Sequence, residues 1–327
     1  MSTMRAVYIT ATGDSSILKV SNIPKPVPKP NEVLVKIHFV GVNFGDTLYR
    51  AGKRAFSLPG VLGAEASGEI VEIGSDVTHY SVGDRVALLG GATYAEYTVV
   101  RDDLIAKVPD GVSYEKAAAA LAIGMTSLGL VKLGYEVKKG DWVLIHAAAG
   151  GIGLVLCQLC KQAGAHVIGT TSSDTKAEMV KRAGADHVLN YKTHTNDQVF
   201  AQIEKLTNGR LVHVVFDSVG ADMFDLSLRS TRDFGTVVEY GIASGEVPPF
   251  NLLRLGEKST TLKFFNLHVA IATREGFTSL ANEVLKLVED GKLDLNISKI
   301  YTLDQVKEVH DALESRQTIG KLLLKIQ

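Results

Sequence analysis

The pattern of hydrophobic and polar positions changes near residue 125. Before it, short segments rich in β-forming residues alternate with Gly and Pro, as in Glu32–His38, Ala66–Ile73 and Tyr94–Val100. Segments this short and closely spaced predict a compact, partly closed β-structure. We therefore expect a first, mainly-β domain over residues 1–124.

After residue 125, apolar segments alternate with helical stretches, which predicts a parallel sheet covered by helices on both faces. Six such strands with crossover helices are typical of the doubly wound Rossmann fold. We expect this dinucleotide-binding domain over residues 125–265. The expected strands are Trp142–His146, His166–Gly169, His187–Asn190, Val212–Phe216, Gly235–Tyr240 and Thr261–Phe265.

The last part of the chain has a mixed pattern. An amphipathic stretch at Ser279–Glu289 precedes a β-like Ser298–Thr302, a helical Leu303–Ser315 and an apolar strand at Lys321–Ile326. We expect this segment, residues 266–327, to rejoin the first domain. The predicted fold class is α/β, with a Rossmann domain and a mainly-β domain.

Composition narrows the function classes. The chain has 327 residues, 46% of them hydrophobic, and a formal net charge of −1. No stretch concentrates Lys and Arg with aromatic residues, which argues against a nucleic-acid site and an anionic membrane and favours a small-molecule partner. The N-terminus lacks the pattern of a secretory signal, and we find no apolar run near the roughly 18 residues that span a bilayer. We expect a soluble, cytoplasmic protein.

The two cysteines, Cys157 and Cys160, have the spacing of a redox or metal pair. They fall within a predicted helix, where such spacing places two residues on one face. We interpret them as small apolar residues packed in the core.

A glycine-rich turn gives the first chemical signal. The strand Trp142–His146 runs into Ala147-Ala-Ala-Gly-Gly-Ile-Gly153 and then into an apolar helix. A strand, such a turn and a helix in this order are the setting in which a pyrophosphate binds at a helix N-terminus. Gly153 would let the helix pack close to the sheet. The expected phosphate-binding residues are Gly150, Gly151, Ile152 and Gly153.

The residues after the second Rossmann strand indicate which dinucleotide binds. NAD-binding proteins usually have an acidic residue about 20 positions after the glycines, which accepts hydrogen bonds from the ribose. Here the hydroxyls of Thr171, Ser172 and Ser173 could donate to a 2′-phosphate, and Lys176 could neutralise it. This pattern predicts NADPH. Asp174 is either the first residue of a helix or a ribose contact.

Several separated motifs together resemble the quinone oxidoreductases, the zinc-free branch of the medium-chain dehydrogenase and reductase superfamily that includes zeta-crystallin. They occur in order and cover nearly the whole chain. The motifs are Gly41-Val-Asn-Phe-Gly-Asp46, Gly63-Ala-Glu-Ala-Ser-Gly-Glu-Ile70, Val82-Gly-Asp-Arg-Val86, the turn at 147–153, Phe216-Asp-Ser-Val-Gly220 and Glu314-Ser-Arg316.

The resemblance implies a chaperonin-10-like (GroES-like) catalytic domain formed by both ends of the chain, a nicotinamide cofactor and a homodimer. It places Asn43 and Thr126 near the nicotinamide, and Lys176 and Tyr191 near the 2′-phosphate; Tyr191 could instead cap the sheet. The remaining implied cofactor contacts are Ser218, Tyr240, Gly241, Ile242, Phe265, Asn266, Leu267 and Lys321.

Two positions argue against a metal. Zinc-dependent relatives have a Cys ligand where this chain has Asn43, and a Gly-His-Glu where it has Gly63-Ala64-Glu65. We therefore predict no metal site. Without a Lewis acid, the enzyme must reduce a substrate that is already electrophilic, such as a quinone or a conjugated enone.

The candidate catalytic residues are Asn43, Asp46 and Tyr49. Tyr49 could donate a proton, and Asp46 could fix the local geometry or accept hydrogen bonds from nearby backbone N–H groups. Leu48 and Arg54 stand where relatives in the resembled family have aromatic residues, so the substrate pocket departs from the family pattern.

The sequence thus predicts an oxidoreductase, an NADPH-dependent, zinc-independent quinone reductase. An alkene reductase acting on enones, enals or enoyl thioesters is the alternative, because the same hydride geometry serves a carbon–carbon double bond. A third hypothesis is a nucleotide-binding protein with a structural, crystallin-like role.

Overall fold

The protein is described here from a computed structural model, which covers residues 2–326. The chain forms two compact units. Unit 1 joins the N-terminal residues up to 125 to the residues from 271 onward, and unit 2 is the continuous stretch 126–270. The sequence pattern had suggested domain boundaries after residues 124 and 265.

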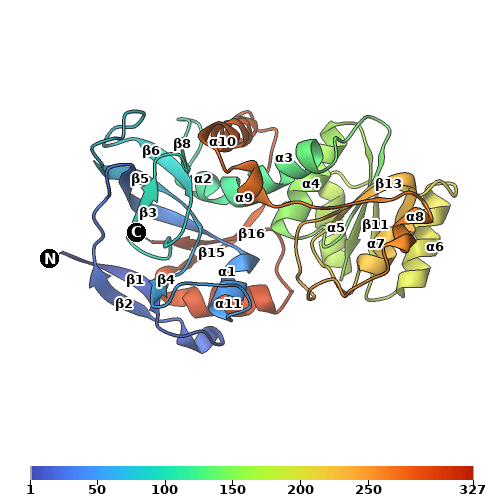
Figure 1. The fold of residues 1–327 in the computed structure, drawn as a ribbon, viewed down its shortest axis with the longest axis horizontal. Helices are drawn as coiled ribbons and strands as arrows, with labels where there is room; N and C mark the ends of the chain where they lie inside the picture. Colours follow the sequence, from blue (N-terminus) through green and yellow to red (C-terminus); the bar gives the residue numbers. More distant parts are fainter. Residues whose placement is uncertain (1, 327) are drawn as a thin grey trace. The chain divides into compact units, whose positions relative to one another are not determined.

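Unit 1 contains two sheets (Figure 1). The smaller has the order β2-β1-β4, and the larger has the order β15-β16-β3-β5-β6-β8, with β7 pairing β3 off this path. Its strands are β1 Thr3–Ile9, β2 Val20–Pro24, β3 Glu32–Val42, β4 Gly60–Val61, β5 Glu65–Ile73, β6 Arg85–Leu89, β7 Tyr97–Arg101, β8 Ile105–Lys107, β15 Ile297–Thr302 and β16 Lys321–Lys325. Its helical elements are η1 Ser15–Ile17, α1 Phe44–Arg50, α2 Tyr114–Ala120, η2 Leu121–Met125, α10 Arg274–Glu289, η4 Leu303–Gln305 and α11 Val306–Glu314.

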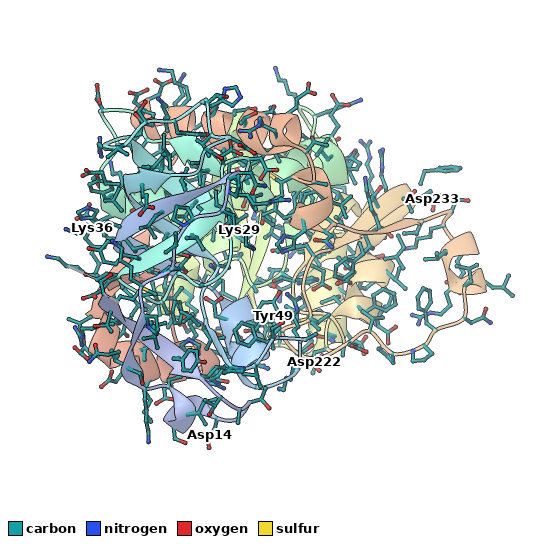
Figure 2. The ribbon with its side chains drawn as sticks, turned by 60° about the vertical axis from the view of Figure 1, so that its left-hand side comes forward. Asp14, Lys29, Lys36, Tyr49, Asp222 and Asp233 are labelled. Carbon is teal, nitrogen blue, oxygen red and sulfur yellow. The ribbon has the colours of Figure 1, made fainter. Side chains whose placement is uncertain are left out.

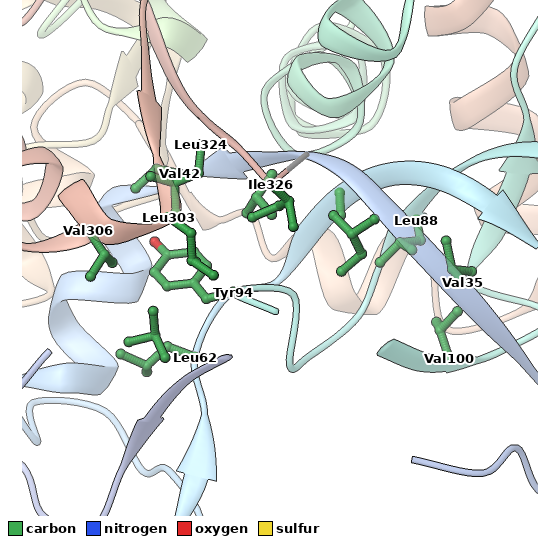
Figure 3. Close-up of a cluster of buried hydrophobic side chains, with 14 of the residues drawn as sticks. Val35, Val42, Leu62, Leu88, Tyr94, Val100, Leu303, Val306, Leu324 and Ile326 are labelled. Carbon is green, nitrogen blue, oxygen red and sulfur yellow. The ribbon is translucent and has the colours of Figure 1, made fainter. Parts of the chain in front are cut away.

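The strand β16 lies second from one edge of this larger sheet, between β15 and β3. β16 pairs antiparallel with β3, with Leu322 opposite Val42 and Leu323 opposite Gly41, and parallel with β15 on its other side. The two ends of the chain therefore share one core. Figure 3 shows part of that core, where Tyr94 lies among aliphatic side chains from both ends.

Unit 2 is a six-stranded sheet in which every pair is parallel, with the order β11-β10-β9-β12-β13-β14. This is the strand order of the Rossmann fold. The strands are β9 Trp142–Ile145, β10 His166–Thr171, β11 His187–Asn190, β12 Val212–Asp217, β13 Thr231–Glu239 and β14 Thr261–Phe264. The helical elements are α3 Thr126–Gly129, η3 Leu130–Gly134, α4 Gly151–Gln162, α5 Asp174–Arg182, α6 Asn196–Leu206, α7 Phe224–Ser230, α8 Leu253–Gly256 and α9 Leu267–Ala270.

All six predicted Rossmann strands are present, and only β13 differs markedly in length. It begins at Thr231, four residues before the predicted Gly235, because its register with β12 slips between the pairs Val212↔Thr231 and Val214↔Thr236. Phe234, inside this irregular stretch, has φ +58° and is largely exposed. An alternation pattern does not encode such a slip.

Helix caps explain another difference. The predicted amphipathic helix at Ser279–Glu289 begins earlier, at Arg274, because the Thr273 hydroxyl accepts a hydrogen bond from the Gly276 N–H at 3.1 Å and so caps the N-terminus.

Cys157 and Cys160 are both buried in α4, as predicted, and burial raises the pKa of the Cys157 thiol to about 12. Both are core residues in the protonated form.

One helical run meets the length and composition of a membrane span. The residues Tyr114–Gly134 average a hydropathy of 1.6 over their most apolar window, which corrects the expectation that no apolar run approaches that length. In the structure 72% of that window is buried, as in the core helix of a soluble protein. The run is therefore weak support for a membrane span.

Candidate active site

Three polar side chains meet in unit 1, where Glu65 and Lys321 are buried and Asn43 is half-buried. The Lys321 Nζ donates to Glu65 Oε2 at 2.6 Å and to Asn43 Oδ1 at 2.7 Å, and the Asn43 amide N–H₂ group donates to Glu65 Oε2 at 3.2 Å. The second carboxylate oxygen, Glu65 Oε1, accepts the N–H of Ala122 at 2.6 Å. We call Glu65, Asn43 and Lys321 the Glu65 network. It fixes a positive charge beside a residue predicted to approach the nicotinamide.

The strand register assembles this network. Because Leu322 lies opposite Val42, the preceding Lys321 lies beside the end of β3, where Asn43 follows. Glu65 opens the neighbouring strand β5, whose first four residues are all buried. A side chain at Gly41 would collide with Glu65 Oε2 and with the Ala118 carbonyl oxygen, so a glycine is needed to make room for the carboxylate.

A second buried chain of hydrogen bonds involves Asp46. Its Oδ2 accepts the backbone N–H of Asn43 and the hydroxyl of Tyr94, each at 2.9 Å. The Tyr94 oxygen lies 3.1 Å from Nε2 of His310. The structure therefore shows the acceptor role expected for Asp46, with partners from both ends of the chain.

Burial determines whether Asp46 and His310 carry a charge. It raises the pKa of Asp46 to about 6, against the lowering effect of its two hydrogen bonds, and it lowers the pKa of His310 to about 3. His310 is neutral near pH 7. Since Tyr94 gives its one proton to Asp46, we assign the His310 proton to Nε2, which donates to the Tyr94 oxygen. Nδ1 then carries only a lone pair, and it has no partner within residues 2–326.

The helix α1 carries Asp46 and Tyr49 and is anchored at its C-terminal end. The buried Arg50 binds both carboxylate oxygens of Glu314, at 3.0 and 2.7 Å, and donates to the Gly13 carbonyl. Tyr49, labelled on α1 in Figure 2, is half-buried, and its ring packs against Phe56 at 6.2 Å between centroids. The Arg50 pairing gives a structural role to the Glu314-Ser-Arg316 motif.

The glycine-rich turn of unit 2 leads directly into α4. Gly150 is the N-cap with extended backbone, and α4 begins at Gly151, so the N–H groups of its first turn have no acceptor within the helix. A Cβ at Gly153 would lie 2.6 Å from the carbonyl oxygens of Ala147 and Ala148, so the close packing predicted for Gly153 is present. The turn thus presents free N–H groups of the kind that bind a phosphate at a helix N-terminus.

The segment after β10 has the geometry of a capped helix. The Ser173 hydroxyl accepts the Lys176 N–H at 3.4 Å, and Asp174 is the first residue of α5. Asp174 therefore has the helix-terminal position that was one of its two interpretations. Lys176 is half-buried, and burial lowers the pKa of its ammonium group. A phosphate beside it would offset this loss of hydration. Thr171 is buried, and Ser172 is half-buried.

Three other predicted cofactor contacts meet at the carboxyl ends of two adjacent unit 2 strands. Ser218 follows β12, Tyr240 and Gly241 follow β13, and the Tyr240 hydroxyl is hydrogen-bonded to Ser218. A Cβ at Gly241 would lie 2.7 Å from the Ser218 carbonyl oxygen, so these two loops pack tightly. Such strand ends are where ligands of open α/β sheets bind. The remaining predicted contacts in unit 2 are Thr126 at the start of α3, Tyr191 after β11, Ile242 after Gly241, and Phe265, Asn266 and Leu267 at the end of β14 and the start of α9.

The residues at the expected metal positions do not fit a zinc ion. Asn43 and Glu65 both accept hydrogen bonds from the Lys321 ammonium, so a cation already occupies the place between them. Within residues 2–326, no group of three or more His, Cys, Asp or Glu side chains could hold a metal ion. We derive no step that uses a metal.

Comparison with known proteins identifies the family. A family model described as "Alcohol dehydrogenase GroES-like domain" matches residues 29–110, and one described as "Zinc-binding dehydrogenase" matches residues 151–286. A probable quinone oxidoreductase of Schizosaccharomyces pombe is 37% identical over 97% of this chain and 96% of its own length. The chain belongs to the quinone oxidoreductase family. The predicted family and the GroES-like plus Rossmann fold class are confirmed.

Two further relatives have names that state a cofactor or a substrate. The structure of Escherichia coli quinone oxidoreductase complexed with NADPH has a TM-score of 0.94 and 34% identity, covering 99% of this chain and 100% of that one. A 2-haloacrylate reductase of a Burkholderia species is 33% identical over 91% of each chain.

Sequence reasoning missed Glu65, Tyr94 and His310 as members of the site. Glu65 had a signal, since it is a lone acidic residue between two alanines in a β-like segment. Lys321 had the complementary signal, since it is a charged residue at the start of an apolar strand. The pairing itself was not readable, because it depends on a strand register between residues 256 positions apart.

Proposed function

We propose that this protein is an NADPH-dependent quinone reductase. The observation that carries the proposal is its similarity, over nearly the whole chain, to a quinone oxidoreductase whose structure holds NADPH. The glycine-rich turn at the start of α4 supports a dinucleotide, and Lys176 with the Thr171–Ser173 hydroxyls supports the 2′-phosphate form.

The chain's own residues would divide the work of binding. The N–H groups of Gly151, Ile152 and Gly153 would hold the pyrophosphate, and the family resemblance assigns Asn43 and Lys321 to the cofactor as well. When bound, the cofactor supplies the hydride. The Glu65 network keeps the Asn43 amide and the Lys321 ammonium in fixed positions, so that neither has to reorder when a ligand arrives.

Proton supply is the second requirement. We propose Tyr49 as the proton donor, since it lies on the same short helix as Asp46 and has a hydroxyl group. Asp46 would act as a positioning residue, because its carboxylate accepts the backbone N–H of Asn43 and so fixes the start of α1.

The test is a steady-state screen of simple quinones and conjugated enones with NADPH and with NADH, followed by identification of the products. We expect NADPH oxidation with quinones and formation of hydroquinone or semiquinone. Absence of NADPH oxidation with every quinone tried would refute the proposal.

The similarity to 2-haloacrylate reductase favours a second candidate, reduction of an activated carbon–carbon double bond. Product analysis separates the two functions, because this reaction yields a saturated carbonyl compound or acid. Enone turnover with a saturated product and no quinone turnover would establish the alternative. NADPH binding without turnover of either class would instead support the non-enzymatic hypothesis.

We also propose that the protein is a cytoplasmic homodimer. Several large apolar side chains of unit 2 are exposed, including Leu252, Leu253 and Val269, each more than 70% accessible, and a second copy could cover them. Light scattering coupled to size-exclusion chromatography tests the dimer, since a monomeric mass at micromolar concentration would exclude it. Cell fractionation tests the location.

A further inference from the structure

Two buried carboxyl groups lie side by side at the carboxyl ends of neighbouring strands in unit 2. Asp217 ends β12, Glu239 ends β13, and the strand register places the two residues directly opposite each other. They are 0% and 4% exposed, and their side chains are hydrogen-bonded to each other. Because two ionised carboxylates in contact repel each other, one of the two groups must hold a proton.

The other hydrogen bonds of Asp217 show which group holds it. Asp217 Oδ1 accepts the N–H groups of Val219 at 2.7 Å and Gly220 at 3.2 Å. Its Oδ2 accepts the hydroxyl of Ser227 at 2.7 Å. A carboxyl group that accepts three donors is in its ionised form, so Glu239 is the protonated partner and its O–H donates to Asp217. Burial, then the charge of Asp217 and the hydrogen bond with it, raise the pKa of Glu239 to about 9.

The other ionisable groups around this pair do not oppose that arrangement. Tyr240, next in the chain, and His146, beside Asp217 on the β9 side, are neutral near pH 7, because burial raises the pKa of the first and lowers that of the second. The Lys263 ammonium of β14 donates to a backbone carbonyl of η3. The charged residues of α7 are exposed and form ion pairs elsewhere, and the segment 247–250 has no charged residue.

The Asp217 carboxylate anchors one of two loops that are tied together. We call residues 218–222 and 241–245 the paired loops. Gly220 has φ +81°, and a Cβ there would lie 2.6 Å from the Gly245 carbonyl oxygen, so the loops are in close contact. A displacement at Asp217 is therefore passed to both. Three backbone hydrogen bonds join the loops, from the N–H of Ala243 to the carbonyl of Ser218, from Ser244 to Val219 and from Ala221 to Gly245.

The paired loops carry several of the predicted cofactor contacts. Ser218, Gly241 and Ile242 lie within them, and Tyr240 directly precedes the second loop. Ligands of open α/β sheets bind at such strand ends. The position of the loops therefore bears directly on the dinucleotide that the protein is proposed to bind.

We propose that Glu239 is a positioning residue for the cofactor: in its protonated form it holds Asp217, and through Asp217 the paired loops, in the arrangement that binds a nicotinamide dinucleotide. This inference rests on the proposed function for the identity of the ligand. When Glu239 loses its proton, the two carboxylates repel each other, and Asp217 can no longer hold the N–H groups of Val219 and Gly220 in place.

The first test needs no cofactor. Hydrogen–deuterium exchange followed by mass spectrometry, on the full chain, measures the protection of the backbone N–H groups of the first paired loop. Glu239→Leu should speed this exchange roughly tenfold or more at pH 7, because it removes the donor to Asp217. Glu239→Gln keeps an N–H donor and should retain the slow exchange. Asp233→Asn is the matched control, since Asp233, labelled in Figure 2, is an exposed carboxylate at the other end of β13 and its loss should change nothing.

The second test is the pH profile of NADH binding, measured by fluorescence titration. NADH is the probe because it lacks the 2′-phosphate, so that the lowered pKa of Lys176 does not affect the result. The affinity of the natural chain should fall roughly tenfold between pH 8 and pH 10, because Glu239 is protonated below about 9 and ionised above it. The affinity of Glu239→Gln should stay level relative to the natural chain at pH 8.

The outcomes separate this inference from the proposed function. Equal loop exchange in the natural chain and Glu239→Leu, or the same pH profile in the natural chain and Glu239→Gln, would overturn the role of Glu239. If thermal unfolding shows that Glu239→Leu is not folded, the pH profiles of the other two chains still decide. A chain that binds neither NADH nor NADPH would refute the proposed function, whereas the exchange test, made without cofactor, would still report on the Asp217–Glu239 pair.

Discussion

The ammonium of Lys321 and the carboxylate of Glu65 form an ion pair 2.6 Å long, and the two side chains are 2% and 0% exposed. Water does not hydrate either charge, so each depends on the other and on the further hydrogen bonds from Asn43 and Ala122. Removing one partner leaves an uncompensated charge in the core. Removing both does not.

This asymmetry gives the first prediction. Glu65→Ala should lower the free energy of unfolding by about 3 to 5 kcal/mol, because Lys321 is left unpaired. The double substitution Glu65→Ala with Lys321→Met should recover most of that loss. Urea unfolding followed by circular dichroism measures both.

An exposed pair serves as the matched control. Arg5 and Asp304 form an ion pair at the surface of the same unit, and Asp304→Ala should cost about 1 kcal/mol or less. If the single Glu65 variant were no less stable than the Asp304 variant, the Glu65 network would not support the fold.

The second prediction concerns the cofactor. Lys176→Ala should weaken NADPH binding by about 1.5 to 3 kcal/mol and leave NADH binding nearly unchanged, because only NADPH has the 2′-phosphate that a charged hydrogen bond would hold. Fluorescence titration of both cofactors measures this. Lys181, on the same helix and paired with Glu178, is the control, since Lys181→Ala should change neither affinity. Equal losses for NADPH and NADH would refute the role of Lys176.

The third prediction follows from the raised pKa of Asp46. Its folded value of about 6 exceeds the ordinary 3.8, so the group stabilises the fold fully below pH 3.8, and this contribution is lost as the pH rises through 6. At about 1.4 kcal/mol per pKa unit, the change is about 3 kcal/mol. The difference in unfolding free energy between the natural chain and Asp46→Asn should therefore fall by most of that amount, about 2.4 kcal/mol, between pH 4 and pH 7. A constant difference across this range would show that Asp46 does not titrate as described.

The fourth prediction tests the proton donor. Tyr49→Phe should lower kcat for quinone reduction roughly 100-fold and leave the NADPH dissociation constant unchanged, since it removes one hydroxyl and keeps the ring that packs against Phe56. Phe56→Leu controls for loss of that packing alone and should lower kcat much less. An unaltered kcat in Tyr49→Phe would assign the proton to water.

Much of the fold could be predicted because its signals are local. Each unit 2 strand is a short apolar run between helical stretches, and the glycine-rich turn lies between a strand and a helix, so a window of a few residues contains the information. The early start of β13 could not be predicted, because a slip against β12 produces it. The start of α10 depended on one threonine hydroxyl.

The candidate site was harder to predict from the sequence, because its contacts join residues far apart in the chain. Asn43, Asp46 and Lys176 could be named because they lie in motifs, whereas Tyr94 and His310 looked like ordinary core residues. Only the folded chain brings the Tyr94 hydroxyl to Asp46 and His310, which are separated from it by 48 and 216 positions. Contacts of this length depend on the whole topology.

The placement of β16 within the larger sheet of unit 1 also bears on how the chain is made. Unit 2 is continuous along the chain, whereas β3 and β5 are translated before it and β16 is translated after it. Until then Glu65 lacks its ammonium partner, and β3 has an open edge. We therefore expect unit 2 to become protease-resistant on stalled nascent chains before unit 1 does, and chaperones to be needed mainly for the half that was synthesised first.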